Sequence, residues 1–178
     1  IEQEILWIGT FDKGIETFNI TTNKYEPNIV PKELSGLLDN VGIYAITKGI
    51  DDDIWIGTFG KGIWRYDLKD KSFHNFSNKT NSEKSISSNR VRCLMMDKNS
   101  NVWVGTQSGL NLLTITDSLK TKWQIKRFFY DKNTSSGEDI LTLFQDTRGV
   151  IWAGARAKGL FRFNGNTFEN VTINTAND

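Results

Sequence analysis

Basic and aromatic residues recur at one point of the sequence, in a short turn-like segment that ends in Gly. Lys stands directly before this Gly three times, and the same segments carry an Arg and two Phe. Cations beside aromatic rings could hold an anionic oligosaccharide through charge and stacking. The alternative is that Lys is simply a soluble residue in an exposed turn. The candidate ligand-binding residues are Phe11, Lys13, Phe59, Lys61, Arg156 and Lys158.

Nucleophilic, metal-binding and acid–base residues are sparse. The single Cys, Cys93, excludes an intrachain disulfide and a Cys-based zinc site, and the single His, His74, excludes a multi-histidine metal cluster. We expect Cys93 to be a buried small residue and His74 to lie on a solvated outer strand. The acidic run 51–53 lacks the spacing of a calcium loop and is explained by turn chemistry. We predict no catalytic residue, no metal site and no cofactor.

Charge and composition exclude further classes of protein. The 178 residues include 22 Lys and Arg against 21 Asp and Glu, with no run of five or six like charges, which argues against nucleic-acid binding by this segment. No apolar stretch approaches the roughly 18 residues of a membrane span. The sequence opens on IEQEILWIGT, without Met or a signal peptide, so we expect it to be an excerpt. Aromatic residues at 12%, 15 Gly and two Pro favour many short strands.

A repeat of about 48 residues organises the chain. Its centre is a segment like Ile54-Trp-Ile-Gly-Thr58, in which Trp is followed two residues later by Gly, and a Gly-Ile or Gly-Leu pair comes six or seven residues after each Trp. A fixed period of this length indicates a repeat architecture. The repeated residues that we expect in the core are Trp7, Trp55, Trp103, Trp152, Gly57, Gly105 and Gly154.

Each repeat divides into four short segments with strand character. An apolar stretch precedes the Trp strand, and an alternating strand and a shorter polar strand follow it. Four antiparallel strands in each repeat predict an all-β fold of β-propeller blades. The long polar connections between repeats, 27–40, 77–89 and 131–138, are expected to be loops, and no long helix is predicted.

The chain is one partial propeller of about 3.75 blades. We place blade 1 at about 1–28 without its first strand, and the others at about 41–76, 89–129 and 138–173. Propellers normally close to avoid open sheet edges. Either the chain is a piece of a larger ring, or two copies pair as a homodimer and cover each other's open faces.

Inter-blade packing is the expected role of the four repeated Trp, because large side chains must fill the space between neighbouring blades. The Gly two residues after each Trp is expected where the next blade approaches closely. Small residues aligned with Cys93, namely Ala45 and Thr142, fit a crowded ring centre.

These landmarks resemble the two-component regulator propeller repeat. Asp146-Thr-Arg-Gly-Val-Ile-Trp152 and Gly57-Thr-Phe-Gly-Lys-Gly62-Ile carry the likeness best, and four copies in register span almost the whole chain. Gly49 replaces the strand-ending Asp, Ala155 replaces the Thr, and the third turn is one residue short.

The resemblance implies a periplasmic sensor region of a bacterial hybrid two-component system, attached to a histidine kinase outside this chain. It implies a non-catalytic module that responds to a glycan, with an oligosaccharide ligand. A protein-interaction scaffold is the alternative. A propeller lyase is disfavoured, because it would need a His or Tyr acid–base pair and often a metal.

Overall fold

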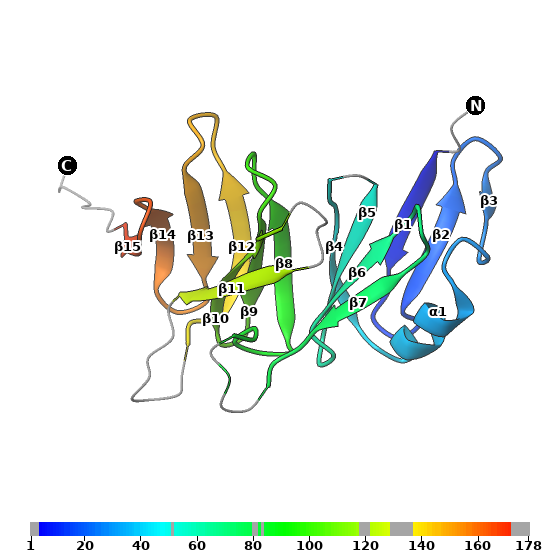
Figure 1. The fold of residues 1–178 in the computed structure, drawn as a ribbon, viewed down its shortest axis with the longest axis horizontal. Helices are drawn as coiled ribbons and strands as arrows, with labels where there is room; N and C mark the ends of the chain where they lie inside the picture. Colours follow the sequence, from blue (N-terminus) through cyan, green and yellow to red (C-terminus); the bar gives the residue numbers. More distant parts are fainter. Residues whose placement is uncertain are drawn as a thin grey trace, which may run out of the picture.

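Four antiparallel sheets stand side by side in an open arc (Figure 1). The structure is a computed structural model that describes residues 4–50, 52–79, 82, 84–117, 122–128 and 137–171. Within each sheet the strands follow chain order. The first sheet has three strands, β1 (Ile5–Gly9), β2 (Ile15–Asn19) and β3 (Lys24–Tyr25). Its place in the arc is at the N-terminal end, and the fourth sheet lies at the other end (Figure 1).

The other three sheets have four strands each. The second contains β4 (Ile43–Lys48), β5 (Asp53–Thr58), β6 (Ile63–Asp67) and β7 (Phe73–Phe76). The third contains β8 (Val91–Met96), β9 (Val102–Thr106), β10 (Gly109–Ile115) and β11 (Trp123–Phe128). The fourth contains β12 (Ile140–Gln145), β13 (Ile151–Ala155), β14 (Gly159–Phe163) and β15 (Phe168–Asn170). The predicted class, propeller blades of four antiparallel strands with one incomplete blade, is confirmed, and the sheets do not close into a ring.

Apolar side chains fill the three joints between neighbouring sheets. In the middle joint Trp55 is fully buried against Phe76 and Trp123, and in the last joint Trp103 stacks on Phe128 and is 2% exposed. Trp7 packs in the first joint and is partly exposed. Trp152 of the fourth sheet is also partly exposed. Burial of large rings between sheets is therefore deepest in the middle of the arc.

The Gly after each repeated Trp lies where two strands approach closely. A Cβ added at Gly57 would lie 2.6 Å from Val91 Cγ1 of the next sheet, and one at Gly105 would lie 2.8 Å from the Ile140 carbonyl oxygen. On its own sheet Gly105 pairs with Cys93, and a Cβ added at Gly105 would also clash with the Cys93 Sγ. Only residues without a Cβ fit these points, and a small residue is needed opposite them.

A carboxylate accepts a hydrogen bond from the repeated indole in the last three sheets. Asp97 accepts from Trp103 at 2.8 Å, and Asp146 accepts from Trp152 at 3.2 Å. Burial opposes ionisation of Asp146, but hydrogen bonds from the Val150 amide and the Trp152 indole, together with the Arg148 guanidinium, lower its pKa below its ordinary value.

The second sheet makes the same bond from a different position. Gly49 stands where Asp97 and Asp146 stand in the other sheets, and Asp53 instead accepts from the Trp55 indole at 3.1 Å. The Asp53 carboxylate is 2% exposed, pairs with Arg65, and lies where a side chain at position 49 would be. The departure from the repeat is thus compensated four residues later.

A Thr hydroxyl closes the turn between the second and third strands of a repeat. Thr58 Oγ1 donates to the Gly62 carbonyl at 2.8 Å and accepts from the Lys61 amide at 3.0 Å. Gly62 has a φ of 73°, which favours Gly. Ala155 lacks the hydroxyl, so the corresponding turn of the fourth sheet is formed without this bond.

A short helix, α1 (Lys32–Leu38), lies in the connection predicted as a loop. Leu34 and Leu38 are fully buried against the joint between the first two sheets. Leu34, Leu37 and Leu38 have helical spacing, but seven residues make less than two full helical turns, too short a run for the sustained period by which a helix is recognised from sequence. Among the described residues no helix has the length and apolar character needed to cross a membrane.

A candidate ligand-binding row at the sheet ends

The first strand of each four-stranded sheet carries an irregularity at the same place. Pairing with the second strand shifts between Ile43 and Ala45 in β4, and the same shift occurs in β8 and β12. An extra residue in one strand bends it and re-aims its side chain, as often happens near binding sites. The three strands are neighbours, since β8 contacts both β4 and β12. The residues at the shifts are Tyr44, Arg92 and Leu141.

Aromatic rings from two sheets gather at this position. The Tyr44 ring stacks on Phe59 with centroids 5.2 Å apart and an interplanar angle of 24°. Phe11, from the turn after β1, lies 6.3 Å from Tyr44. Phe11 is 72% exposed and Tyr44 is 40% exposed, although both are large apolar rings. The turns of the first two sheets and the irregular position of β4 therefore present an aromatic surface to solvent.

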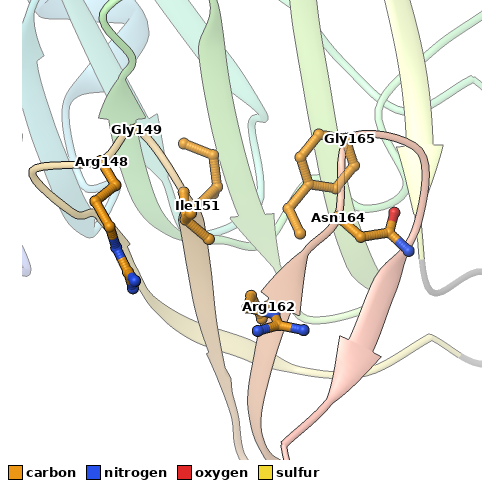
Figure 2. Close-up of a pocket in the computed structure, with 8 residues that line it drawn as sticks. Arg148, Gly149, Ile151, Arg162, Asn164 and Gly165 are labelled. Carbon is orange, nitrogen blue, oxygen red and sulfur yellow. The ribbon is translucent and has the colours of Figure 1, made fainter.

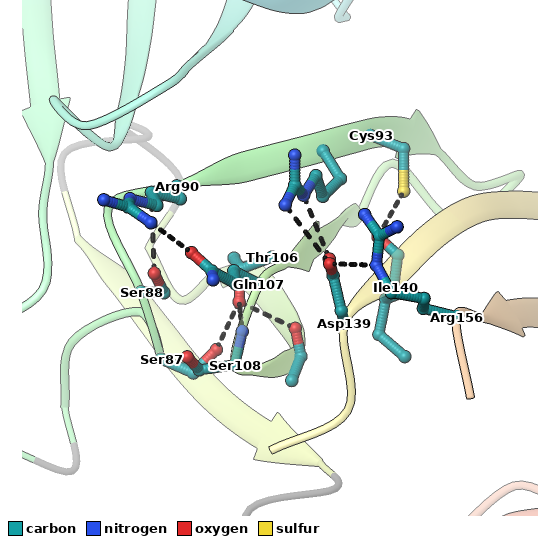
Figure 3. A network of polar contacts seen from close by, with 12 residues as sticks. Ser87, Ser88, Arg90, Cys93, Thr106, Gln107, Ser108, Asp139, Ile140 and Arg156 are labelled. Atoms are coloured by element: carbon teal, nitrogen blue, oxygen red, sulfur yellow. Dashed lines mark hydrogen bonds and ion pairs between the residues drawn. The ribbon is translucent and has the colours of Figure 1, made fainter. Parts of the chain in front are cut away.

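Two guanidinium groups border these rings. The Arg90 guanidinium carbon lies 5.0 Å from the Phe59 centroid, and that of Arg92 lies 5.5 Å from Phe59 and 5.9 Å from Tyr44. These distances are in the range of cation–π attraction. Arg90 donates to Gln107 Oε1 at 3.0 Å (Figure 3). Gln107 carries no charge, and in the described part of the chain no carboxylate pairs with Arg90.

One carboxylate joins the third and fourth sheets. Asp139 accepts two hydrogen bonds from Arg92, at 3.0 and 3.2 Å, and pairs with Arg156 Nε at 2.8 Å (Figure 3). The side chains of Arg92 and Asp139 are 17% and 14% exposed, whereas that of Arg156 is 60% exposed. A two-point pair of this kind fixes the orientation of the Arg92 guanidinium.

The remaining predicted cations take part in local contacts at the same end of the sheets. Lys61 Nζ donates to the Leu37 carbonyl at 2.6 Å, and Lys158 Nζ pairs with Glu138 at 2.9 Å. The Lys13 amide donates to Thr10 Oγ1 and its side chain is exposed. We define the ligand-binding row as Phe11, Tyr44, Phe59, Arg90, Arg92, Asp139 and Arg156.

Sequence reasoning missed Tyr44, Arg90, Arg92 and Asp139. A one-residue irregularity interrupts the two-residue alternation of a strand, but strands of six residues are too short for the interruption to be recognised. Arg90 and Asp139 precede their strands in connections whose course is not encoded locally. One signal was present: the aligned positions 44, 92 and 141 hold three chemically unlike residues in an otherwise regular repeat.

Residues suited to nucleophilic or metal chemistry lie elsewhere. Cys93, expected to be buried, is only partly buried, and this burial raises the pKa of its thiol to about 12, so the thiol is protonated at neutral pH. His74 lies on the outer strand β7 against Phe76, with ring centroids 4.7 Å apart. Asp51 falls outside the described residues, as do residues 131–136 of the third connection. No group of three or more potential metal ligands occurs in the described part of the chain.

A separate depression lies at the opposite end of the fourth sheet. It has a volume of about 550 Å³ and lies between the turns that follow β12 and β14, with Arg148 and Arg162 on its walls (Figure 2). Both guanidinium groups pair with acidic side chains, Asp146 and Glu169. Their charges are thereby compensated.

Comparison with known proteins gives consistent relatives. A model of the two component regulator propeller matches residues 85–108. Histidine kinase P4 of Formosa agariphila is 38% identical over 173 residues, which are 97% of this chain and 13% of that protein. The chain therefore corresponds to a small part of this curated relative.

Solved structures show the same arrangement of sheets. The extracellular domain of a hybrid two-component system from B. thetaiotaomicron superposes with a TM-score of 0.71 at 26% identity, over 95% of this chain and 22% of that one. A catalytically inactive virginiamycin B lyase from Staphylococcus aureus gives a TM-score of 0.64 at 14% identity, over 98% and 54% of the two chains. At that identity the lyase shows the fold alone.

Proposed function

We propose that this chain, in which residues 85–108 match the two component regulator propeller, is part of the periplasmic sensor region of a hybrid two-component regulator and recognises a glycan. The observation that carries the proposal is the likeness of 95% of the chain to an extracellular domain of such a system. The histidine kinase relative supports a signalling role for the parent protein. The proposed module is non-catalytic and passes ligand occupancy to a kinase outside this chain.

The ligand-binding row supports glycan recognition by its composition and position. It combines exposed aromatic rings with guanidinium groups at the ends of rigid sheets, where loops and turns commonly carry binding residues. Sugars offer apolar C–H faces for rings and hydroxyl groups for charged donors. The candidate residues in the turns, Phe11, Phe59 and Arg156, belong to this row, and Lys13, Lys61 and Lys158 lie at the same end of the sheets.

Uncovered sheet faces favour a second role in protein–protein association. Leu6 in the first sheet is 52% exposed, whereas Ile54 and Val102 at the same repeat position are 6% and 0% exposed. Leu160 in the fourth sheet is 40% exposed, whereas Ile63 at its repeat position is fully buried. Apolar faces of this kind mark surfaces that another protein covers. This observation supports a scaffold role or a homodimer, and it equally suits a larger ring in which further blades of the parent protein cover these faces.

Thermal unfolding of the complete polypeptide with a panel of neutral and acidic oligosaccharides tests glycan sensing. A ligand that binds only the native state raises the midpoint by mass action. We expect at least one oligosaccharide class to raise it, and Phe11→Ala with Phe59→Ala to remove the effect. Tyr25→Ala, which removes an exposed ring on the outer strand β3, is the matched control. Partner capture with no response to any oligosaccharide would support the scaffold instead.

A further inference from the structure

We infer that the ligand-binding row takes an acidic sugar, with one pyranose face on Tyr44 and Phe11 and the anionic group of that sugar on Arg90 and Arg92. The inference rests on the proposed glycan-sensing function and narrows it to glycans that carry a carboxylate or a sulfate. It also assigns ligand contacts to Tyr44, Arg90 and Arg92, which lie outside the turns between the second and third strands where the predicted residues stand.

The ligand-binding row carries an excess of positive charge. Arg92 and Arg156 share the single carboxylate of Asp139, and Arg90 makes an ion pair with no carboxylate in the described residues. Three guanidinium groups and one carboxylate leave an excess of two positive charges. Lys158 adds nothing to this excess, because Glu138 pairs with it. A carboxylate or sulfate accepts strong, geometrically specific hydrogen bonds from guanidinium groups.

The two guanidinium groups lie close to the aromatic rings. Arg92 lies beside both stacked rings, Tyr44 and Phe59, and Arg90 lies over Phe59. A pyranose seated on Tyr44 and Phe11 would therefore hold its anionic substituent within reach of both cations. The two bonds from Arg92 to Asp139 use its Nε and one terminal nitrogen. Among the described residues no hydrogen bond from its other terminal nitrogen is found, and Asp139 fixes the orientation of the guanidinium group, so this nitrogen is the one that we assign to the ligand.

The irregular positions of β4, β8 and β12 bring three unlike side chains together. They place Tyr44, Arg92 and Leu141 side by side in three neighbouring strands, with an aromatic, a cationic and an aliphatic side chain in turn. The scaffold repeats but these side chains do not, so the row offers one aromatic–cation subsite. The order of the side chains sets the direction in which an oligosaccharide can lie.

Titration calorimetry on the complete polypeptide tests the inference with three probes. These are trigalacturonic acid, a sulfated galactose trisaccharide and neutral galactotriose. The main variants are Arg90→Gln, which keeps a side chain that can pack on Phe59, and Tyr44→Leu. The matched control is Lys126→Gln, because Lys126 Nζ also lies over a Phe ring, 4.9 Å from Phe128, but on the outer strand β11. The control removes the same net charge away from the row.

We expect at least one acidic probe to bind more tightly than galactotriose and to weaken as salt is added. Loss of a charge-assisted hydrogen bond should reduce its affinity about tenfold to a hundredfold in Arg90→Gln, with no change in Lys126→Gln. Comparison of the first two probes tells whether the row prefers carboxylate or sulfate.

Two results overturn the inference in distinguishable ways. If galactotriose binds as tightly as both acidic probes, or if Arg90→Gln and Lys126→Gln weaken an acidic probe equally, the acidic subsite is wrong and glycan sensing stands. If no oligosaccharide binds, the inference fails together with the proposed function.

Discussion

Gly49 and Asp53 form a compensating pair whose energetic coupling can be measured. The third sheet supplies the template, because Asp97 and Asn101 occupy the positions of Gly49 and Asp53, and Asn101 donates to Asp97 at 3.0 Å. Exchanging the pair in the second sheet as Gly49→Asp with Asp53→Asn should transplant this arrangement. Each single change should instead damage the second sheet.

The expected magnitudes follow from the contacts. Asp53→Asn removes one of the two carboxylate partners of Arg65, because Asp67 also pairs with Arg65 at 3.1 Å, and it removes the charge that accepts from the Trp55 indole. Loss of these charge-assisted hydrogen bonds should cost about 3 kcal/mol. Gly49→Asp places a side chain onto the Asp53 carboxylate and 2.8 Å from Trp55 Nε1. Overpacking and the proximity of two buried carboxylates should cost about 3 kcal/mol.

The double variant should lose much less than the sum of these costs. The carboxylate introduced at position 49 would accept from the Trp55 indole and from the amide introduced at position 53, so we expect a loss of about 3 kcal/mol and a coupling energy of similar size. Urea unfolding monitored by Trp fluorescence measures all four proteins. Gly36→Asp is the matched control, because nothing lies within 4 Å of a Cβ added there. Additivity of Gly49→Asp and Asp53→Asn within about 0.5 kcal/mol would refute the compensation.

Three further outcomes can be checked on the same chain. Gly105→Ala should lower the free energy of unfolding by about 1–3 kcal/mol, because the added methyl meets the Ile140 carbonyl at 2.8 Å, whereas Gly36→Ala in α1 should be neutral or stabilising; equal effects in urea unfolding would contradict this. Cys93 is partly buried and its pKa is raised to about 12, so it should react with a thiol reagent at pH 8 much faster after unfolding than before; equal labelling rates of the native and unfolded chain would contradict the raised pKa. The pKa of Asp146 is lowered in the folded state, so its contribution to stability should be complete above its unfolded pKa and disappear as pH falls through its folded pKa; thermal unfolding of Asp146→Asn should therefore approach that of wild type in acid, and a constant difference across pH would argue against it.

The fold could be predicted because the residues that pack neighbouring sheets together recur along the sequence. A Trp every 48 or 49 residues, with Gly two residues after it, indicates that each sheet must pack against the next in the same way. With four in-phase copies, departures at single positions such as Gly49 and Ala155 did not hide the period. The predicted strand number and antiparallel order are confirmed. The helix α1 escaped prediction because its stability comes from burying Leu34 and Leu38 at one joint, which is a tertiary cause.

The candidate site could be predicted only in part, for the opposite reason. Phe11, Phe59 and Arg156 stand at repeat-aligned turns, and alignment alone brings them to one end of the sheets. Arg90 reaches Phe59 through a connection between sheets, and its proximity depends on how the second and third sheets pack. A single sequence carries no local record of such a contact, and a one-residue shift within a strand of six residues, such as β4, interrupts too short an alternation to be recognised.

Repeated positions thus stabilise the packing of the sheets, whereas unrepeated positions supply the side chains of the candidate site. Residues that recur, such as Trp103, Asp97 and Gly105, fill and hydrogen-bond the joints, so the sheets keep fixed relative positions. Because those positions are fixed, side chains that do not recur, such as Tyr44 and Arg92, can be held in place before a ligand arrives. Preorganisation of this kind lowers the entropy lost on binding. A substitution at a joint should therefore weaken ligand binding indirectly and together with stability. Arg90→Gln loses only exposed contacts with Phe59 and Gln107, so it should weaken binding of an acidic sugar while changing the unfolding midpoint of the free chain much less.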